Sequence, residues 1–132
     1  MPDPNISSAV VLSFDVEEHH RIEAAVGLES VDHLKVEYAR RMETTTRRLL
    51  DQLSEAGVKA TFYVVGQIAE THPKLVQDIS DAGHEVGTHG WDHQRVHRFT
   101  PELFRNDIAK VRKHWNRLWA SRFTVTVPRR LV

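Results

Sequence analysis

Hydrophobic and polar positions alternate along the chain in short blocks. Two apolar runs rich in β-branched or aromatic residues, 9–14 and 60–65, have the length and composition of buried strands. The first run is followed by Asp15, and the second is closed by Gly66. The short stretch His84-Glu85-Val86-Gly87 is expected to be a third, brief strand.

Three longer segments carry apolar residues at helical spacing, and each has a start or stop signal. The first runs from about residue 36 and stops at Gly57, because glycine commonly ends a helix. The second begins at Pro73 and ends at Gly83, and the third extends over residues 100–118 from a Thr-Pro-Glu start. We therefore expect three helices that alternate with the three strands.

The alternation of strands and helices predicts an α/β fold with parallel strands joined by right-handed crossovers. Residues 17–31 follow neither period, and we expect them to form a long loop. No repeat or linker divides the 132 residues, which are enough for one domain. Three strands are few for a parallel sheet that should be covered on both faces. We interpret the chain as the N-terminal part of an incomplete fold.

Charge and composition narrow the possible partners. The 18 basic and 18 acidic residues balance, so nothing favours binding to nucleic acid or to an anionic membrane. The absence of cysteine excludes disulfides and thiolate metal sites. No apolar run is long enough to span a membrane, and residues 1–9 lack the pattern of a secretory signal, so a cytoplasmic location is the default. The sequence indicates no particular oligomeric state.

Two groups of metal-binding residue types follow the ends of expected strands, where α/β folds bind their ligands. The first is Asp15-Val16-Glu17-Glu18, and the second is His89-Gly90-Trp91-Asp92-His93, whose imidazoles can share one face of a helical turn. Each group alone is also typical of a solvent-exposed surface. Together, one carboxylate and two imidazoles form a metal site with open positions, and a spare carboxylate such as Asp15 can accept a proton from water. This combination predicts hydrolysis of an amide or ester.

These motifs resemble those of the polysaccharide deacetylases with a NodB homology domain. The Asp-Val-Glu-Glu motif is similar to that of the branch linked to exopolysaccharide gene clusters. The resemblance extends from about Val10 to Lys113. Its most specific parts are Ser13–Glu18, Arg47–Leu50, Gly57–Val64 and Ala82–His93.

The resemblance implies a distorted (β/α) barrel that removes N-acetyl groups from a polysaccharide amino sugar, with an acetylated polysaccharide or oligosaccharide as substrate. Asp15 matches the general base of the family, and His89 and His93 match its two metal-binding histidines. By position, Glu17 is the metal-binding carboxylate, with Glu18 as the alternative. One divalent metal ion is expected as cofactor; zinc is the default, and cobalt, iron, nickel and manganese are also possible with these ligands.

The sequence departs from the family after about Leu118. A Gly-Tyr-Arg-Ala-Pro motif, a later aspartate and a histidine acid have no match. We interpret residues 1–132 as a single partial domain and residues 119–132 as a non-native tail, which a frameshift in the gene would explain. Such a chain is expected to be unstable or impaired in turnover. Two other functions stay open, namely a non-catalytic metal- or glycan-binding remnant and a hydrolase of another C–N bond, such as that of a cyclic ureide.

Overall fold

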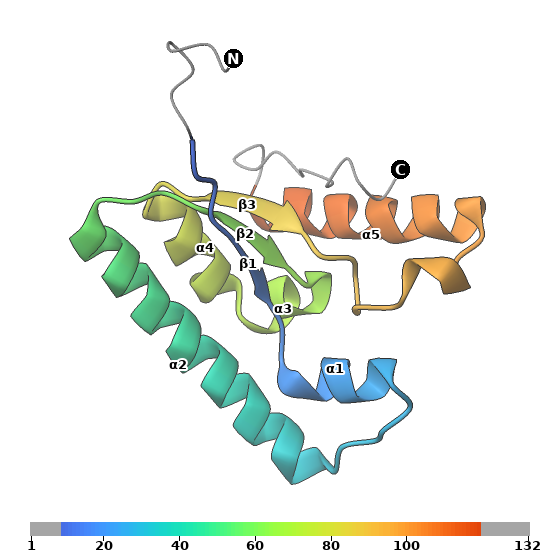
Figure 1. The fold of residues 1–132 in the computed structure, drawn as a ribbon. Helices are drawn as coiled ribbons and strands as arrows, with labels where there is room; N and C mark the ends of the chain where they lie inside the picture. The colour runs from blue at the N-terminus through green and yellow to red at the C-terminus, as the bar shows by residue number, and fades with distance from the viewer. Residues whose placement is uncertain (1–8, 120–132) are drawn as a thin grey trace, which may run out of the picture.

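The computed structural model describes residues 9–119, which form a three-stranded parallel sheet flanked by helices (Figure 1). This confirms the predicted α/β class and the parallel strands. The predictions for residues 120–132 lie outside the described part of the chain. In chain order, the elements are β1 (Ser13–Val16), α1 (His19–Ala25), α2 (Asp32–Ala56), β2 (Thr61–Val64), α3 (Gly66–Thr71), α4 (Pro73–Asp81), β3 (Glu85–Thr88), the 3₁₀ helix η1 (Val96–Arg98) and α5 (Pro101–Trp119).

The sheet has the order β1-β2-β3, and both strand pairs are parallel. Ser13 pairs with Thr61 at the start of the strands, and Val64 pairs with both Val16 and Thr88 at their ends. Because all three strands end in register, the residues that follow them meet at one edge of the sheet. Helices α1 and α3 also begin at this edge, as Figure 1 shows.

The apolar core lies around the central strand. Phe62 and Val64 of β2 are completely buried, and α2 contributes Met42 and Leu53 from the apolar stripe that its sequence predicts. The other fully or almost fully buried side chains come from the segment after β2 and from α4 and α5: Val65, Ile68, Ala69, Leu75, Val76, Ile79, Val111 and Trp115.

No helix within residues 9–119 has the length and apolar character needed to cross a membrane.

The predicted loop at 17–31 is wrong, because its first half forms α1. This helix buries no apolar residue, and so it lacks the apolar period by which a helix is found in a sequence. Polar contacts hold it in place instead. The carboxylate of Glu23 accepts hydrogen bonds from the hydroxyls of Ser30 and of Tyr38 in α2, the latter at 3.2 Å.

The first strand begins later than its apolar run predicts. Val10 and Val11 are 86% and 82% exposed, and β1 starts only at Ser13. The reason lies in the neighbouring strand. Since β2 begins at Thr61, which pairs with Ser13, residues 10 and 11 have no strand beside them in the described part of the chain.

Candidate metal centre

The carboxyl edge of the sheet brings together side chains that are far apart in the sequence. Asp15 lies near the end of β1 and Glu17 directly follows it, whereas His89 directly follows β3. The backbone N–H of His89 donates to the carbonyl of Val64, 3.0 Å away, and that of Val65 donates to Val16 at 3.2 Å. These bonds continue the sheet just far enough for side chains from β1 and β3 to meet across the end of β2.

Glu17, His89 and His93 form a compact group of possible metal ligands. One ligand atom from each lies within 4.8 Å of the other two. The Nε2 of His93 is 3.1 Å from Oε2 of Glu17, and the Nε2 of His89 is 3.9 Å from Oε1 of the same carboxylate. Glu17 and both predicted histidine ligands are therefore brought together from three separate positions in the chain.

Two atoms of this group indicate that a cation belongs among them. Oε2 of Glu17 and Nε2 of His89 are buried, and neither forms a hydrogen bond within the described residues; Nε2 of His93 lies 3.1 Å from Oε2 but not in hydrogen-bonding geometry. Buried polar atoms in native proteins are nearly always paired, because an unpaired one loses its interaction with water. A carboxylate and two imidazoles are also the ligand types that suit a divalent transition metal. The residues present thus fit a metal ion.

Asp15 lies beside this group rather than within it. Its Oδ2 is 3.8 Å from Nε2 of His89, and 54% of its side chain is exposed, against 15% for Glu17. A carboxylate in this position can contact solvent and also an ion or molecule bound to the imidazole of His89. A proton acceptor beside a bound metal ion would need both kinds of contact.

Glu18, the alternative carboxylate, turns away from the histidines. Its side chain is buried and forms an ion pair with Arg21, which donates from Nε and, at 3.3 Å, from Nη2. Burial by itself would raise the pKa of Glu18, but the hydrogen bond and the positive charge of Arg21 hold it below its ordinary value. Glu18 is therefore ionised and already paired.

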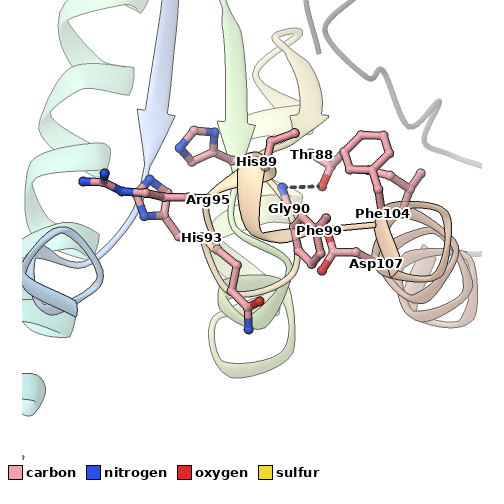
Figure 2. Close-up of a pocket in the computed structure, with 11 residues that line it drawn as sticks. Thr88, His89, Gly90, His93, Arg95, Phe99, Phe104 and Asp107 are labelled. Atoms are coloured by element: carbon pink, nitrogen blue, oxygen red, sulfur yellow. Dashed lines mark hydrogen bonds between the residues drawn. The ribbon is translucent and has the colours of Figure 1, made fainter. Parts of the chain in front are cut away.

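The segment that carries the histidines is a loop, so the expectation that both imidazoles share a helical turn is wrong. Gly90 has a φ of 80°, and His93 has a φ of 65°, the one positive φ among non-glycine residues 9–119. The N–H of Gly90 donates to the hydroxyl of Thr88 at 3.1 Å, which tightens the first bend (Figure 2). A left-handed backbone conformation at a histidine costs conformational free energy, and residues with such strained backbones are concentrated at functional sites.

Helices α3 and α5 hold the histidine loop from both sides. The N–H groups of Gly66 and Gln67 donate to the carbonyls of Gly90 and Trp91 at 2.8 Å and 3.0 Å. A carboxylate oxygen of Asp107 accepts from the N–H of Trp91 at 3.2 Å. Of these supporting residues, Gly66 alone had a signal in the sequence, as the glycine that closes the predicted strand at 60–65.

The same loop forms one wall of a cavity of about 190 Å³. The imidazoles of His89 and His93 lie toward β1, whereas Phe104 and Asp107 lie toward α5 (Figure 2). Burial is the main reason why the pKa of Asp107 is raised. His89 and His93 are themselves among the lining residues, so the cavity adjoins the ligand group.

A more open groove of about 420 Å³ lies between α1 and α2, next to the ligand group. Glu17 belongs to both, which makes the groove continuous with the candidate metal centre. The imidazole of His19 packs edge-on against the ring of Tyr38, with 5.0 Å between ring centroids. The remaining lining residues are Arg41, Met42 and Thr45.

Comparison with known proteins identifies the family. A family model described as polysaccharide deacetylase matches residues 6–130. A peptidoglycan-N-acetylglucosamine deacetylase of Bacillus cereus is 37% identical over 73 residues, which are 55% of this chain and 26% of that protein. The chain thus spans about a quarter of the length of this relative.

Solved structures show the same fold. A peptidoglycan N-acetylglucosamine deacetylase crystallised with a benzamide compound aligns with a TM-score of 0.58 and 28% identity, over 82% of this chain and 40% of that one. PuuE allantoinase aligns with a TM-score of 0.65 over 92% of this chain and 48% of its own, but at 18% identity the likeness extends to the fold alone. On the match over residues 6–130, this chain belongs to the polysaccharide deacetylase family.

Proposed function

We propose that this chain carries the metal-binding part of a hydrolase that removes N-acetyl groups from a polysaccharide amino sugar. The observation that supports it best is the convergence of Glu17, His89 and His93, with two buried atoms that form no hydrogen bond within the described residues. Zinc is the ion we propose, because two imidazoles and one carboxylate are common ligands of catalytic zinc. The Asp-Val-Glu-Glu motif favours the branch linked to exopolysaccharides.

The chain's own residues divide the chemistry between them. Glu17, His89 and His93 would hold the ion, which would polarise the amide carbonyl and make a water molecule more acidic. Asp15, half exposed and 3.8 Å from His89, would accept the proton of the attacking water. The left-handed backbone at His93 would keep its imidazole turned toward Glu17.

The groove between α1 and α2 is the place where we propose that the sugar chain binds. It contains Glu17, so a sugar bound there would lie next to the metal ligands. The ring of Tyr38 and the guanidinium of Arg41 offer an apolar face and hydrogen-bond donors, which suit a hydroxyl-rich ligand. The name of the Bacillus cereus relative, a deacetylase of N-acetylglucosamine in peptidoglycan, supports an N-acetylated amino sugar as substrate.

Titration of the metal-free protein with zinc tests this proposal. The wild-type chain should bind one equivalent, and His89→Ala should bind at least about 100-fold more weakly, because even residues behind the ligands contribute 10–100-fold. His97→Ala is the matched control, since His97 lies exposed on η1 and does not belong to the ligand group. Absence of zinc binding by the wild-type chain would refute the proposed site.

The alternative functions give different results in the same preparation. Release of acetate from an N-acetylglucosamine oligomer, dependent on added zinc, would support the deacetylase. Zinc and oligomer binding without acetate release would indicate a non-catalytic binding protein. Turnover of a cyclic ureide in place of the sugar would support the third function, for which the allantoinase-like fold is a reason to test.

A further inference from the structure

We propose that Glu18 and Arg21 are positioning residues that, through Gln67, fix the spacing between the two ligand-bearing segments of the candidate metal centre. The inference rests on the proposed metal site and gives Glu18, the second glutamate of the Asp-Val-Glu-Glu motif, a role other than metal binding. We call the three side chains the Arg21 bridge.

The ion pair of this bridge is almost completely withdrawn from water. The side chains of Arg21 and Glu18 are 9% and 6% exposed. Removing two charges from water is costly, and buried ion pairs often add little to stability compared with apolar residues of similar size. This buried pair lies one residue away from the candidate ligand Glu17. It is therefore better explained by the geometry that it imposes on the ligand-bearing segment than by a contribution to stability.

The bridge extends from the β1 segment to the histidine loop without interruption. Nη1 of Arg21 donates to Oε1 of Gln67 at 2.6 Å. The backbone N–H of Gln67 then donates to the carbonyl of Trp91 at 3.0 Å, in the middle of the stretch between His89 and His93. One arginine thus connects the carboxylate ligand's segment to the segment of both imidazoles.

The shape of the guanidinium makes this connection specific. Arg21 donates from Nε and Nη2 to Glu18 and from Nη1 to Gln67, so all three donor nitrogens belong to one rigid, planar group. Charge-assisted hydrogen bonds of this kind are strong and directional. A lysine would keep the charge but could not make the same three contacts at once.

A second arginine, whose side chain is 40% exposed, provides a control with the same pattern of contacts. Arg47 also uses Nε and Nη2 for one carboxylate, Glu43, and Nη1 for a second partner, Asp78. It connects α2 to α4 and touches no residue of the ligand group. Arg47→Gln therefore removes an interaction of the same form away from the metal centre.

Titration with Co²⁺, followed by its visible absorption, separates positioning from stability. Arg21→Gln should weaken Co²⁺ binding by about 10–100-fold, the usual cost of losing a residue that orients ligands, and should alter the absorption spectrum of the bound ion. Arg21→Lys should restore only part of the affinity, and Gln67→Leu should weaken binding while Glu18 and Arg21 stay paired. Arg47→Gln should lower the Tm but leave the affinity and the spectrum unchanged.

The result that overturns the inference is a folded Arg21→Gln protein with wild-type affinity and spectrum. An equal loss of affinity in Arg47→Gln would overturn it too, because the effect would then be general destabilisation. If Arg21→Gln does not fold, Gln67→Leu decides, and wild-type binding by that variant refutes the bridge. Failure of the wild-type chain to bind Co²⁺ is a separate outcome, which refutes the proposed metal site itself.

Discussion

Asp15 and Glu17 are two residues apart and have different surroundings. Glu17 is 15% exposed and lies within the ligand group, whereas Asp15 is 54% exposed and lies beside it. The residue pattern alone does not distinguish the three carboxylates at 15, 17 and 18; the family resemblance assigned Asp15 as general base and Glu17 as metal ligand by position, with Glu18 as the alternative. The buried contact of Glu18 with Arg21 removes the third carboxylate from the ligand group.

The different surroundings of Asp15 and Glu17 lead to a prediction for zinc affinity. Glu17→Gln should weaken zinc binding at least about 100-fold, as expected for a ligand when residues behind the ligands already contribute 10–100-fold. Asp15→Asn, which has the same loss of charge, should weaken it much less, because its carboxylate is not among the three converging groups. Calorimetric titration of both variants measures this difference. Equal losses would make Asp15 a ligand and contradict its assignment as proton acceptor.

At the scale of elements, the sequence predicted those whose residues are buried with a regular period. Leu75, Val76 and Ile79 are fully or almost fully buried in α4, where the apolar stripe predicts a helix. Helix α1 was not predicted because it buries no apolar residue. Helix α3 was not predicted because its six residues are too few to show a period. Both of these α-helices begin at the carboxyl edge of the sheet, and each contributes to the Arg21 bridge.

The contact between α3 and the histidine loop leads to a prediction for Gly66. A Cβ at this position would lie 2.8 Å from Cε3 and 3.1 Å from Cα of Trp91, so the loop backbone would have to move. Gly66→Ala should destabilise the fold by about 1–3 kcal/mol, as overpacking usually does. It should also weaken zinc binding, because Trp91 lies between the two histidines. Gly57→Ala is a useful contrast: a Cβ there meets nothing within 4 Å, but the φ of 65° makes the substitution strained, so stability should fall while zinc affinity at the remote site is retained.

For the whole molecule, the sequence predicted the class of fold and which residues follow the strand ends. Parallel strands with ends in register bring Glu17 and His89 to one edge, and this follows from topology alone. The path of the loop between His89 and His93 could not be predicted. It depends on the left-handed backbone at His93 and on hydrogen bonds from α3 and α5, which come from residues distant in the sequence.

One buried histidine outside the candidate metal centre couples the stability of the whole fold to pH. His84 is 7% exposed, and its Nδ1 accepts a hydrogen bond from the N–H of Ala60 at 3.1 Å. Its ring also packs against Phe62, with 5.1 Å between centroids. Burial, and to a lesser degree the positive charge of Lys59, lowers the pKa of His84 below its ordinary value of 6.5. The folded chain therefore favours the neutral ring.

The sign of the pH effect follows from proton binding. Below pH 6.5 the unfolded chain protonates this histidine while the folded chain resists, so the unfolded state binds more protons. The stability that the neutral ring contributes is therefore fully present above 6.5 and is lost as the pH falls from there toward the lower pKa of the folded state. The wild-type protein, measured without metal, should lose unfolding free energy over this range.

Substitution of this histidine should flatten the pH dependence. In His84→Asn, the side-chain oxygen can accept from Ala60 much as Nδ1 does, yet it cannot be protonated in this range. The gap in unfolding free energy between wild type and variant should shrink as the pH falls below 6.5, because only the wild type loses this contribution. Urea unfolding at several pH values measures the gap, and His97→Asn, at an exposed position, should leave the wild-type slope unchanged. A gap that stays constant with pH would mean that protonation of His84 does not oppose folding.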